Sequence, residues 1–115
     1  YAVQGSSLLK EAYAETPSGI TLTSPGFYGP QGRELRISSK VKSHIDLALF
    51  MEYKSYRITN FEMETSGLYG LSNLLGHESI TLCAAIANRA NGTFLTDYQP
   101  VIDKLLDYSI AGLTN

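Results

Sequence analysis

The sequence predicts an α/β protein with a mostly parallel or mixed sheet flanked by helices, and two observations support this prediction. Segments with apolar residues at helical spacing alternate with short segments of strand character, in the order helix, strand, loop, helix, strand, helix, strand, helix. The last expected strand, SITLCAAIA at residues 79–87, is almost continuously apolar. Such a run is typical of a strand that helices cover on both faces of a parallel sheet.

The first elements are a helix, a strand and a loop. Apolar residues lie four positions apart between residues 8 and 13, which is helical spacing, and the Pro-Ser-Gly sequence at 17–19 ends this helix. Apolar and polar residues alternate over 20–24, as in a strand. The loop PGFYGPQGR at 25–33 holds three glycines and two prolines in nine residues, so we expect a shaped turn with little freedom to become helical.

The middle of the chain adds a helix and a second strand. Leu35 and Ile37 indicate a short extended piece, and Ser39 is a candidate cap for a helix through HIDLALFMEY at 44–53. YRITNFE at 56–62 has the composition of a strand.

Two further helices flank the third strand. Four leucines between residues 68 and 75 share one helical face, which we expect to pack in the core, and Gly76 stands in the C′ position. Asn91-Gly92-Thr93 is expected to form a turn. A last helix is expected from about Asp97 to Gly112, with Pro100 tolerated in its first turn.

Length and composition describe one ordinary globular domain spanning residues 1–115. The apolar fraction is 43% and the charged fraction is 17%, and we find no internal repeat and no interdomain linker. The net charge of −2 gives no general attraction for nucleic acid or anionic lipid, because only a local cluster is basic (Arg33, Arg36, Lys40 and Lys42). We therefore expect neither a nucleic-acid nor a membrane partner.

Localisation and metal binding are judged from what the sequence lacks. No apolar run approaches the roughly 20 residues that span a bilayer, and no signal pattern opens the chain, so a cytoplasmic protein is expected. Cys83 is the only cysteine, which excludes an intrachain disulfide and predicts a buried, inert thiol. Neither His44 nor His77 has a second ligand at metal-binding spacing, so no metal site is expected.

Polar residues follow the carboxyl ends of all three predicted strands. These segments are residues 27–33, 62–64 and 88–89. If the strands are parallel, the three segments face one pocket, because ligands bind beyond the carboxyl ends of such strands.

This inventory suits a flat polar heterocycle joined to a polyol. A Gln amide and an Arg together match an imide edge, and a carboxylate accepts hydrogen bonds from a vicinal diol. A methionine supplies an apolar floor under a sugar ring. The residues alone thus indicate a nucleoside-like ligand. They leave two other interpretations open: Glu62 and Glu64 as a solvated strand edge and a helix-start carboxylate, and residues 25–33 as a plain connecting loop.

Three motifs carry a resemblance to a known family. FYGPQGR at 27–33 resembles the uracil-recognition loop of uridine phosphorylases. NFEMETSG at 60–67 resembles the Glu-Met-Glu ribose motif of the wider nucleoside phosphorylase superfamily, and AIANRANGTF at 85–94 is similar to the strand-end Asn-Arg of uridine phosphorylases. The three motifs occur in the family's order over essentially the whole chain.

The resemblance implies a role for each site residue. Phe27 packs on the base, Gln31 binds the N3–H and O2 side of uracil, and Arg33 binds the O4 side. Arg89 helps Arg33 to neutralise the departing base. In the ribose site, Met63 lies against the sugar, Glu64 takes the 2′ and 3′ hydroxyls, and Glu62 is a less certain, supporting residue.

The implied reaction is the reversible phosphorolysis of uridine to uracil and ribose 1-phosphate, a pentosyl transfer of nucleoside catabolism and pyrimidine salvage that needs no cofactor. The family's members are homo-oligomers. Their phosphate site is a glycine-rich turn with arginines that has no counterpart here, so the chain resembles the C-terminal half of such an enzyme and is expected to be inactive alone. A Gly between Gln31 and Arg33 departs from the acidic residue that is common there.

Two alternatives remain. The chain could belong to a purine nucleoside phosphorylase or a nucleosidase of the same superfamily, against which Asn88 counts because purine-type enzymes carry an acidic proton donor there. It could also be a non-catalytic module for nucleoside binding or assembly.

Overall fold

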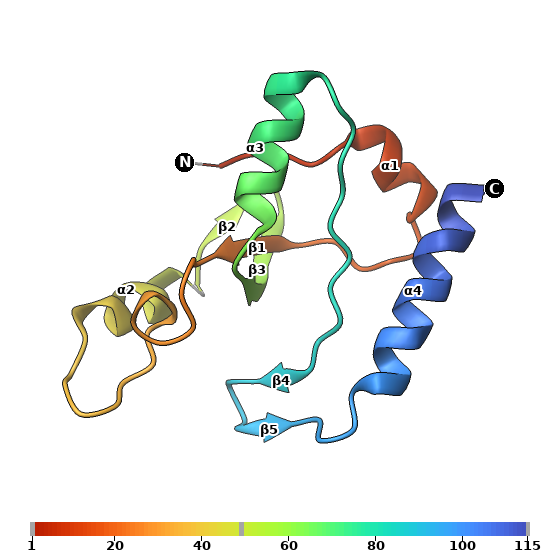
Figure 1. Cartoon of the computed structure of the whole chain (residues 1–115). Coiled ribbons are helices and arrows are strands. Elements are labelled where there is room, and N and C mark those ends of the chain that lie inside the picture. The colour runs from red at the N-terminus through yellow and green to blue at the C-terminus, as the bar shows by residue number, and fades with distance from the viewer. Residues whose placement is uncertain (1, 49, 115) are drawn as a thin grey trace. The chain divides into compact units, whose positions relative to one another are not determined.

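The computed structural model describes residues 2–48 and 50–114. Within them it has an α/β fold, with a mixed three-stranded sheet, a two-stranded sheet and helices, which confirms the predicted fold class (Figure 1). The chain divides into two compact units. The first contains Tyr1–Gln4 and Thr16–His77, and the second contains Gly5–Glu15 and Glu78–Asn115.

The sheet of the first unit has the strand order β1-β3-β2. β1 (Ile20–Thr23) runs parallel to β3 (Tyr56–Glu62), and β2 (Glu52–Tyr53) pairs with β3 in the antiparallel sense. Figure 1 shows β1 beside β3. The parallel pair confirms the direction expected for the first two predicted strands, and it brings their carboxyl ends to one edge.

Two α-helices and a single 3₁₀ turn accompany this sheet in the described part of the first unit. The 3₁₀ turn η1 (Gly29–Gln31) contacts α2 (Lys40–Ala48), whose Ile45 is buried. α3 (Thr65–Leu75) follows β3 directly and ends at Gly76. Gly76 has φ +73°, and its N–H donates to the carbonyl of Ser72, which is the C-cap expected from the sequence.

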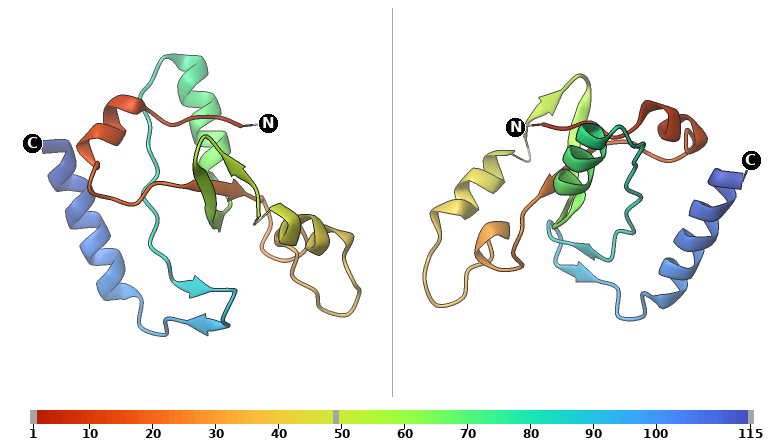
Figure 2. Two further views of the ribbon diagram at one scale, coloured as in Figure 1. Left: turned by 180° about the vertical axis from the view of Figure 1, so that it is seen from behind. Right: turned by 45° about the horizontal axis from the view of Figure 1, so that its top comes forward.

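The second unit is organised around Tyr13. α1 (Ser7–Ala12) begins where the Ser6 hydroxyl accepts a hydrogen bond from the Leu9 N–H at 3.0 Å. Tyr13 follows this helix and is buried; its hydroxyl donates to the Ser109 carbonyl of α4 (Gln99–Thr114) at 2.6 Å. The end of α1 therefore lies against the later turns of α4 (Figure 2).

The second unit also holds a short hairpin. β4 (Ala87–Asn88) pairs with β5 (Thr93–Phe94) in the antiparallel sense. Gly92 has φ +70° in the connection, and the Asn91 side chain accepts from the Thr93 N–H at 3.1 Å, so the predicted Asn-Gly turn is confirmed.

Two expectations for the middle of the chain are wrong. The helix predicted to reach residue 53 ends at Ala48. Glu52 and Tyr53 belong instead to β2, which pairs with β3 because Lys54 and Ser55 adopt φ +50° and +69° and turn the chain back. Residues 35–37 form bends within the described chain, and the expected extended piece is not formed there. Leu35 and Ile37 are consequently exposed.

The third predicted strand is also a correction. Residues 79–86 run without forming a strand in the described structure, although Ile86 accepts a hydrogen bond from the Leu95 N–H at 2.9 Å. Leu82 and Ala84 are half-buried, whereas Cys83 is exposed. Residues 79–82 are half-buried in succession, coverage alternates from Leu82 onward, and no residue of this described run is fully buried. The expectation of a strand covered on both faces is therefore wrong, as is the buried thiol predicted for Cys83.

The leucine face of α3 was expected in the core, and the structure corrects this as well. Leu71 is 61% exposed and Leu74 is 80% exposed. α3 contacts β1, but the described residues of its own unit supply no second layer over the leucines.

In the same described chain, no helix combines the length and apolar character that crossing a bilayer requires.

Candidate nucleoside site at the β1 and β3 edge

Two groups of polar side chains follow the carboxyl ends of β1 and β3. In the register of this parallel pair, Thr23, the last residue of β1, is the partner of Glu62, the last residue of β3. The segments that leave the two strands, the loop 25–33 and residues 63–64, therefore start next to each other. This is the edge at which open parallel sheets bind their ligands.

The first group, which we call the loop cluster, consists of Phe27, Gln31 and Arg33. Nη1 of Arg33 donates to the Phe27 carbonyl and to Oε1 of Gln31, both at 2.5 Å. The Arg33 guanidinium also lies 3.8 Å from the centroid of the Phe27 ring. Gln31 is only 5% exposed. One aromatic ring, one amide and one cation are thus held together in a single turn.

The backbone of this loop explains the cluster. The N–H groups of Gln31 and Arg33 both donate to the Tyr28 carbonyl, at 3.2 and 3.0 Å, which curls the chain through η1. Gly32, between them, has φ +66°, and a Cβ there would lie 3.1 Å from Cδ1 of Ile45 on α2. Gly32 thus suits this position for both its backbone conformation and its close approach to α2.

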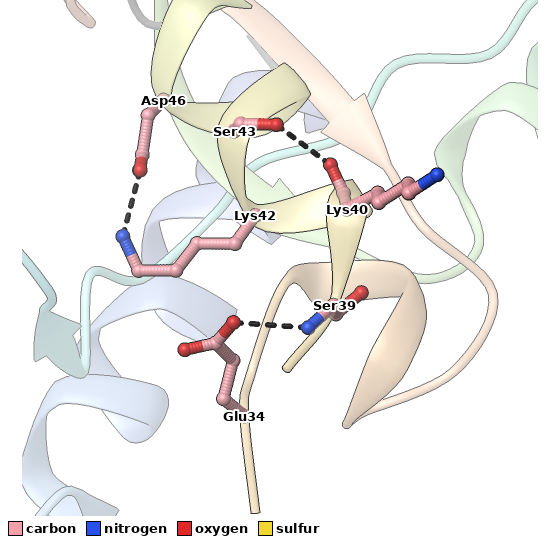
Figure 3. A network of polar contacts seen from close by, with 6 residues as sticks. All are labelled: Glu34, Ser39, Lys40, Lys42, Ser43 and Asp46. Carbon is pink, nitrogen blue, oxygen red and sulfur yellow. Dashed lines mark hydrogen bonds and ion pairs between the residues drawn. The ribbon is translucent and has the colours of Figure 1, made fainter. Parts of the chain in front are cut away.

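A polar network supports the start of α2 beside this loop. The Ser39 N–H donates to Oε1 of Glu34 at 2.9 Å, and Lys42 pairs with Asp46 one turn later at 2.7 Å (Figure 3). The Lys42 pair is exposed and contributes only about 0.3–0.5 kcal/mol. It also neutralises one member of the basic cluster seen in the sequence.

The second group, the carboxylate cluster, is centred on Glu62. Its Oε1 accepts a hydrogen bond from the Thr23 hydroxyl at 2.5 Å, and its Oε2 accepts from the N–H groups of Glu64 and Thr65, each at 2.6 Å. Partial burial alone raises the pKa of Glu62, but the hydrogen bonds from Thr23, Thr65 and Glu64 outweigh burial, so the pKa is lowered. Glu62 is therefore ionised at neutral pH and satisfied by the protein itself.

Glu64 has different surroundings. It stands in the N-cap position of α3, its side chain is exposed, and its Oε2 accepts from the Met63 N–H at 3.2 Å. Met63 is 39% exposed. Of the two carboxylates in the motif, Glu64 is the one presented to solvent.

The predicted site residues are thus distributed over both units. Phe27, Gln31 and Arg33 meet in the loop cluster, while residues 62–64 form one turn at the end of β3. Arg89 lies in the second unit, directly after β4, where the Asn88 side chain accepts a hydrogen bond from the Ala90 N–H. The meeting of Arg89 with the other side chains stays a prediction.

Sequence reasoning missed Thr23. A signal was present, because Thr21 and Thr23 are spaced like Asn60 and Glu62, two residues apart on both strands. In the paired strands Thr21 donates to Oδ1 of Asn60 at 2.8 Å, as Thr23 donates to Glu62. Aligning the two strands by their polar residues would have indicated both pairs.

Comparisons with known proteins give one partial similarity. The chain is 35% identical to a uridine phosphorylase from Thermococcus kodakarensis over 79 residues, which make up 66% of this chain and 27% of that protein. The chain therefore spans about a quarter of the length of the curated relative that it matches. No protein-family model matches the chain, and no solved structure matches it. The similarity supports a relationship to uridine phosphorylases over the matched part.

Proposed function

We propose that this chain is the base- and ribose-binding part of a uridine phosphorylase. The observation that carries the proposal is the parallel pairing of β1 and β3, in which Thr23 and Glu62 end their strands side by side. Through this pairing the loop cluster and the carboxylate cluster leave the same sheet edge, as recognition of one nucleoside requires. The partial similarity to a uridine phosphorylase supports the same reading.

The loop cluster has the chemistry to bind uracil. An amide oxygen carries two lone pairs, so Oε1 of Gln31 can accept the Arg33 N–H that it already holds and also the N3–H of uracil. Because Gln31 is only 5% exposed, the loop must open for the base to reach it. The Gln31 amide nitrogen then donates to O2, and an Arg33 N–H donates to O4. The face of the Phe27 ring that the Arg33 guanidinium does not cover stacks on the base.

The ribose would lie on the Met63 and Glu64 side of the edge. Glu64 is exposed, and its two carboxylate oxygens can each accept a hydrogen bond from one hydroxyl of the 2′,3′-diol. Charge-assisted hydrogen bonds of this kind contribute about 1.5–3 kcal/mol each. Met63 offers a polarisable apolar contact to the sugar ring.

In the proposed reaction, an oxygen of inorganic phosphate forms a bond to C1′ while the bond from C1′ to N1 of uracil breaks. The electron pair of the broken bond stays on the base, which departs as a uracil anion, and Arg33 with Arg89 stabilises that charge. Such electrostatic stabilisation requires neither a covalent intermediate nor a cofactor.

The remaining parts of the proposal concern the whole protein. Residues 1–115 form one domain of a longer, cytoplasmic, homo-oligomeric phosphorylase, and the phosphate site comes from outside these residues. Neither nucleic acid nor membrane takes part. These 115 residues alone are expected to cleave no uridine in the presence of phosphate, and measurable phosphorolysis by them would contradict this part of the proposal.

Calorimetric titration of the full-length protein with uridine and with inosine tests the assignment. We expect saturable binding of uridine that Arg33→Ala weakens by at least about tenfold, since it removes a charged hydrogen bond to the base. A preference for inosine would instead favour a purine nucleoside phosphorylase. Absence of heat and of thermal stabilisation at millimolar uridine would favour an assembly module.

A further inference from the structure

We propose that Thr23 and Glu62 are positioning residues that fix the direction in which the Glu64 side chain leaves the backbone, for binding the ribose diol. This inference rests on the proposed function, because the diol is the ligand that Glu64 would hold. It assigns a role to Thr23, and it separates the two carboxylates of the motif into one that binds and one that orients.

Glu62 holds the backbone on both sides of Glu64. Its Oε2 accepts from the Glu64 N–H, which belongs to the peptide group before the Glu64 Cα, and from the Thr65 N–H, which belongs to the peptide group after it. Both distances are 2.6 Å. Because φ and ψ of a residue are rotations between its two peptide groups, one carboxylate oxygen restrains both angles, −127° and −30° at Glu64. The direction of the Cα–Cβ bond of Glu64 is then set.

Thr23 holds Glu62 in turn. Its hydroxyl donates to Oε1 of Glu62 at 2.5 Å and accepts from the Ser66 N–H in the first turn of α3 at 3.0 Å. One hydroxyl on β1 therefore links the Glu62 carboxylate to the helix that follows Glu64. The two strands and the helix meet at this point, so a shift of any one of them would move the turn that carries Glu64.

The arrangement also explains why Glu62 is poorly suited to bind the sugar itself. Both of its oxygens already accept hydrogen bonds from the protein, and it is half-buried. Glu64 is exposed. A diol would have to displace backbone N–H groups to reach Glu62, whereas it can approach Glu64 without breaking that network.

Binding of two ligands, one with the ribose diol and one without it, distinguishes a positioning role of Thr23 from a general effect on stability. In the full-length protein, Thr23→Val removes the hydroxyl with little change of volume, and Thr23→Ser keeps it. We expect Thr23→Val to weaken uridine binding by about tenfold, by loss of an oriented hydrogen bond. The same variant should weaken binding of 2′,3′-dideoxyuridine by less than about twofold, since that ligand lacks the diol. Thr23→Ser should match the wild type for both.

A second measurement needs no ligand. The NMR chemical shift of an amide proton that donates to a carboxylate changes when the carboxylate is protonated. The chemical shifts of the Glu64 and Thr65 amide protons should therefore follow the titration of Glu62. This dependence should persist in Thr23→Ser and disappear in Glu62→Gln.

The outcomes distinguish the possible failures. If Thr23→Val weakened the binding of uridine and of 2′,3′-dideoxyuridine equally, or weakened neither, the positioning role would be overturned. The proposed function would remain intact. The positioning role would also be overturned if the chemical shifts of the Glu64 and Thr65 amide protons did not change with the titration of Glu62. A wild-type protein that binds no uridine would overturn the proposed function, and the positioning role for a diol would fall with it.

Discussion

The Thr23 hydroxyl and the Glu62 carboxylate meet 2.5 Å apart across the parallel strands β1 and β3. The contact joins residues 39 positions apart in sequence, and it exists only in this register. A shift of one residue would turn the Glu62 side chain to the other face of the sheet. The geometry of the candidate site therefore depends on strand pairing as much as on the motif itself.

Stability should depend on the protonation of Glu62. Because its folded pKa is lowered, the carboxylate contributes stability that is present above the ordinary glutamate pKa of about 4.3 and is lost as the pH falls through the lowered value. We expect Glu62→Gln to lower the free energy of unfolding at neutral pH by about 1 kcal/mol, which is less than the roughly 1.5–3 kcal/mol of a charged hydrogen bond because Glu62 keeps partial contact with water. Urea denaturation at neutral and acidic pH measures the difference, which should shrink on acidification.

A matched control for this experiment is Glu52→Gln, which alters an exposed glutamate on β2 of the same sheet. Its effect should stay within about 0.5 kcal/mol at each pH, as for most surface substitutions. If the two variants behave alike, the internal hydrogen bonds of Glu62 do not stabilise the fold.

Gly32 should tolerate no side chain. Gly32→Ala places a Cβ at φ +66° and 3.1 Å from Cδ1 of Ile45, so we expect the free energy of unfolding to fall by about 1–2 kcal/mol. Uracil binding should weaken in parallel, since Gln31 and Arg33 flank this residue. Gly29→Ala is the control in the same loop, because a Cβ there meets nothing within 4 Å. Equal melting temperatures for the two variants would refute the requirement.

Arg33 should not be replaceable by lysine. Its guanidinium donates to two oxygens and covers the Phe27 ring at the same time, which an ammonium cannot reproduce. We expect Arg33→Lys to weaken uridine binding by at least about tenfold. Arg36→Lys, an exposed change three residues away, should leave the affinity within about twofold. Isothermal titration of both variants with uridine gives the comparison. Similar affinities of the two variants for uridine would show that Arg33 does not bind the base.

The second unit offers a test of its own packing. Tyr13→Phe removes the hydroxyl that donates to the Ser109 carbonyl, and we expect a loss of about 1 kcal/mol. Tyr98→Phe removes the hydroxyl of a tyrosine that is 46% exposed and should change stability by less than about 0.5 kcal/mol. Thermal unfolding followed by circular dichroism should rank the two variants in that order.

Local sequence patterns were sufficient for several elements of the fold. The alternation over residues 20–24 and the composition of 56–62 identified β1 and β3, and Gly76 marked the end of α3. These features depend on a few neighbouring residues. The Asn91-Gly92 turn belongs with them, because its backbone conformation is dictated by the glycine.

Features that depend on pairing or coverage could not be read in the same way. β2 is formed because Lys54 and Ser55 adopt positive φ, and neither lysine nor serine is a residue type that favours such a turn. The apolar run at 79–87 and the leucines of α3 show which residues are hydrophobic, but not which surfaces cover them. Thr23 was missed for the same reason, since its role exists only in the register with Glu62.

The position of Glu62 has a consequence for the electrostatics of the helix that follows. A helix start ordinarily attracts anions, because its first N–H groups point outward and carry partial positive charge. At α3 the Thr65 N–H is already taken by Glu62, and Glu64 adds a second negative charge beside it. An approaching phosphate dianion would be repelled there, whereas an uncharged hydroxylated ring would not. The negative charge at this edge thus favours an uncharged ligand over an anionic one.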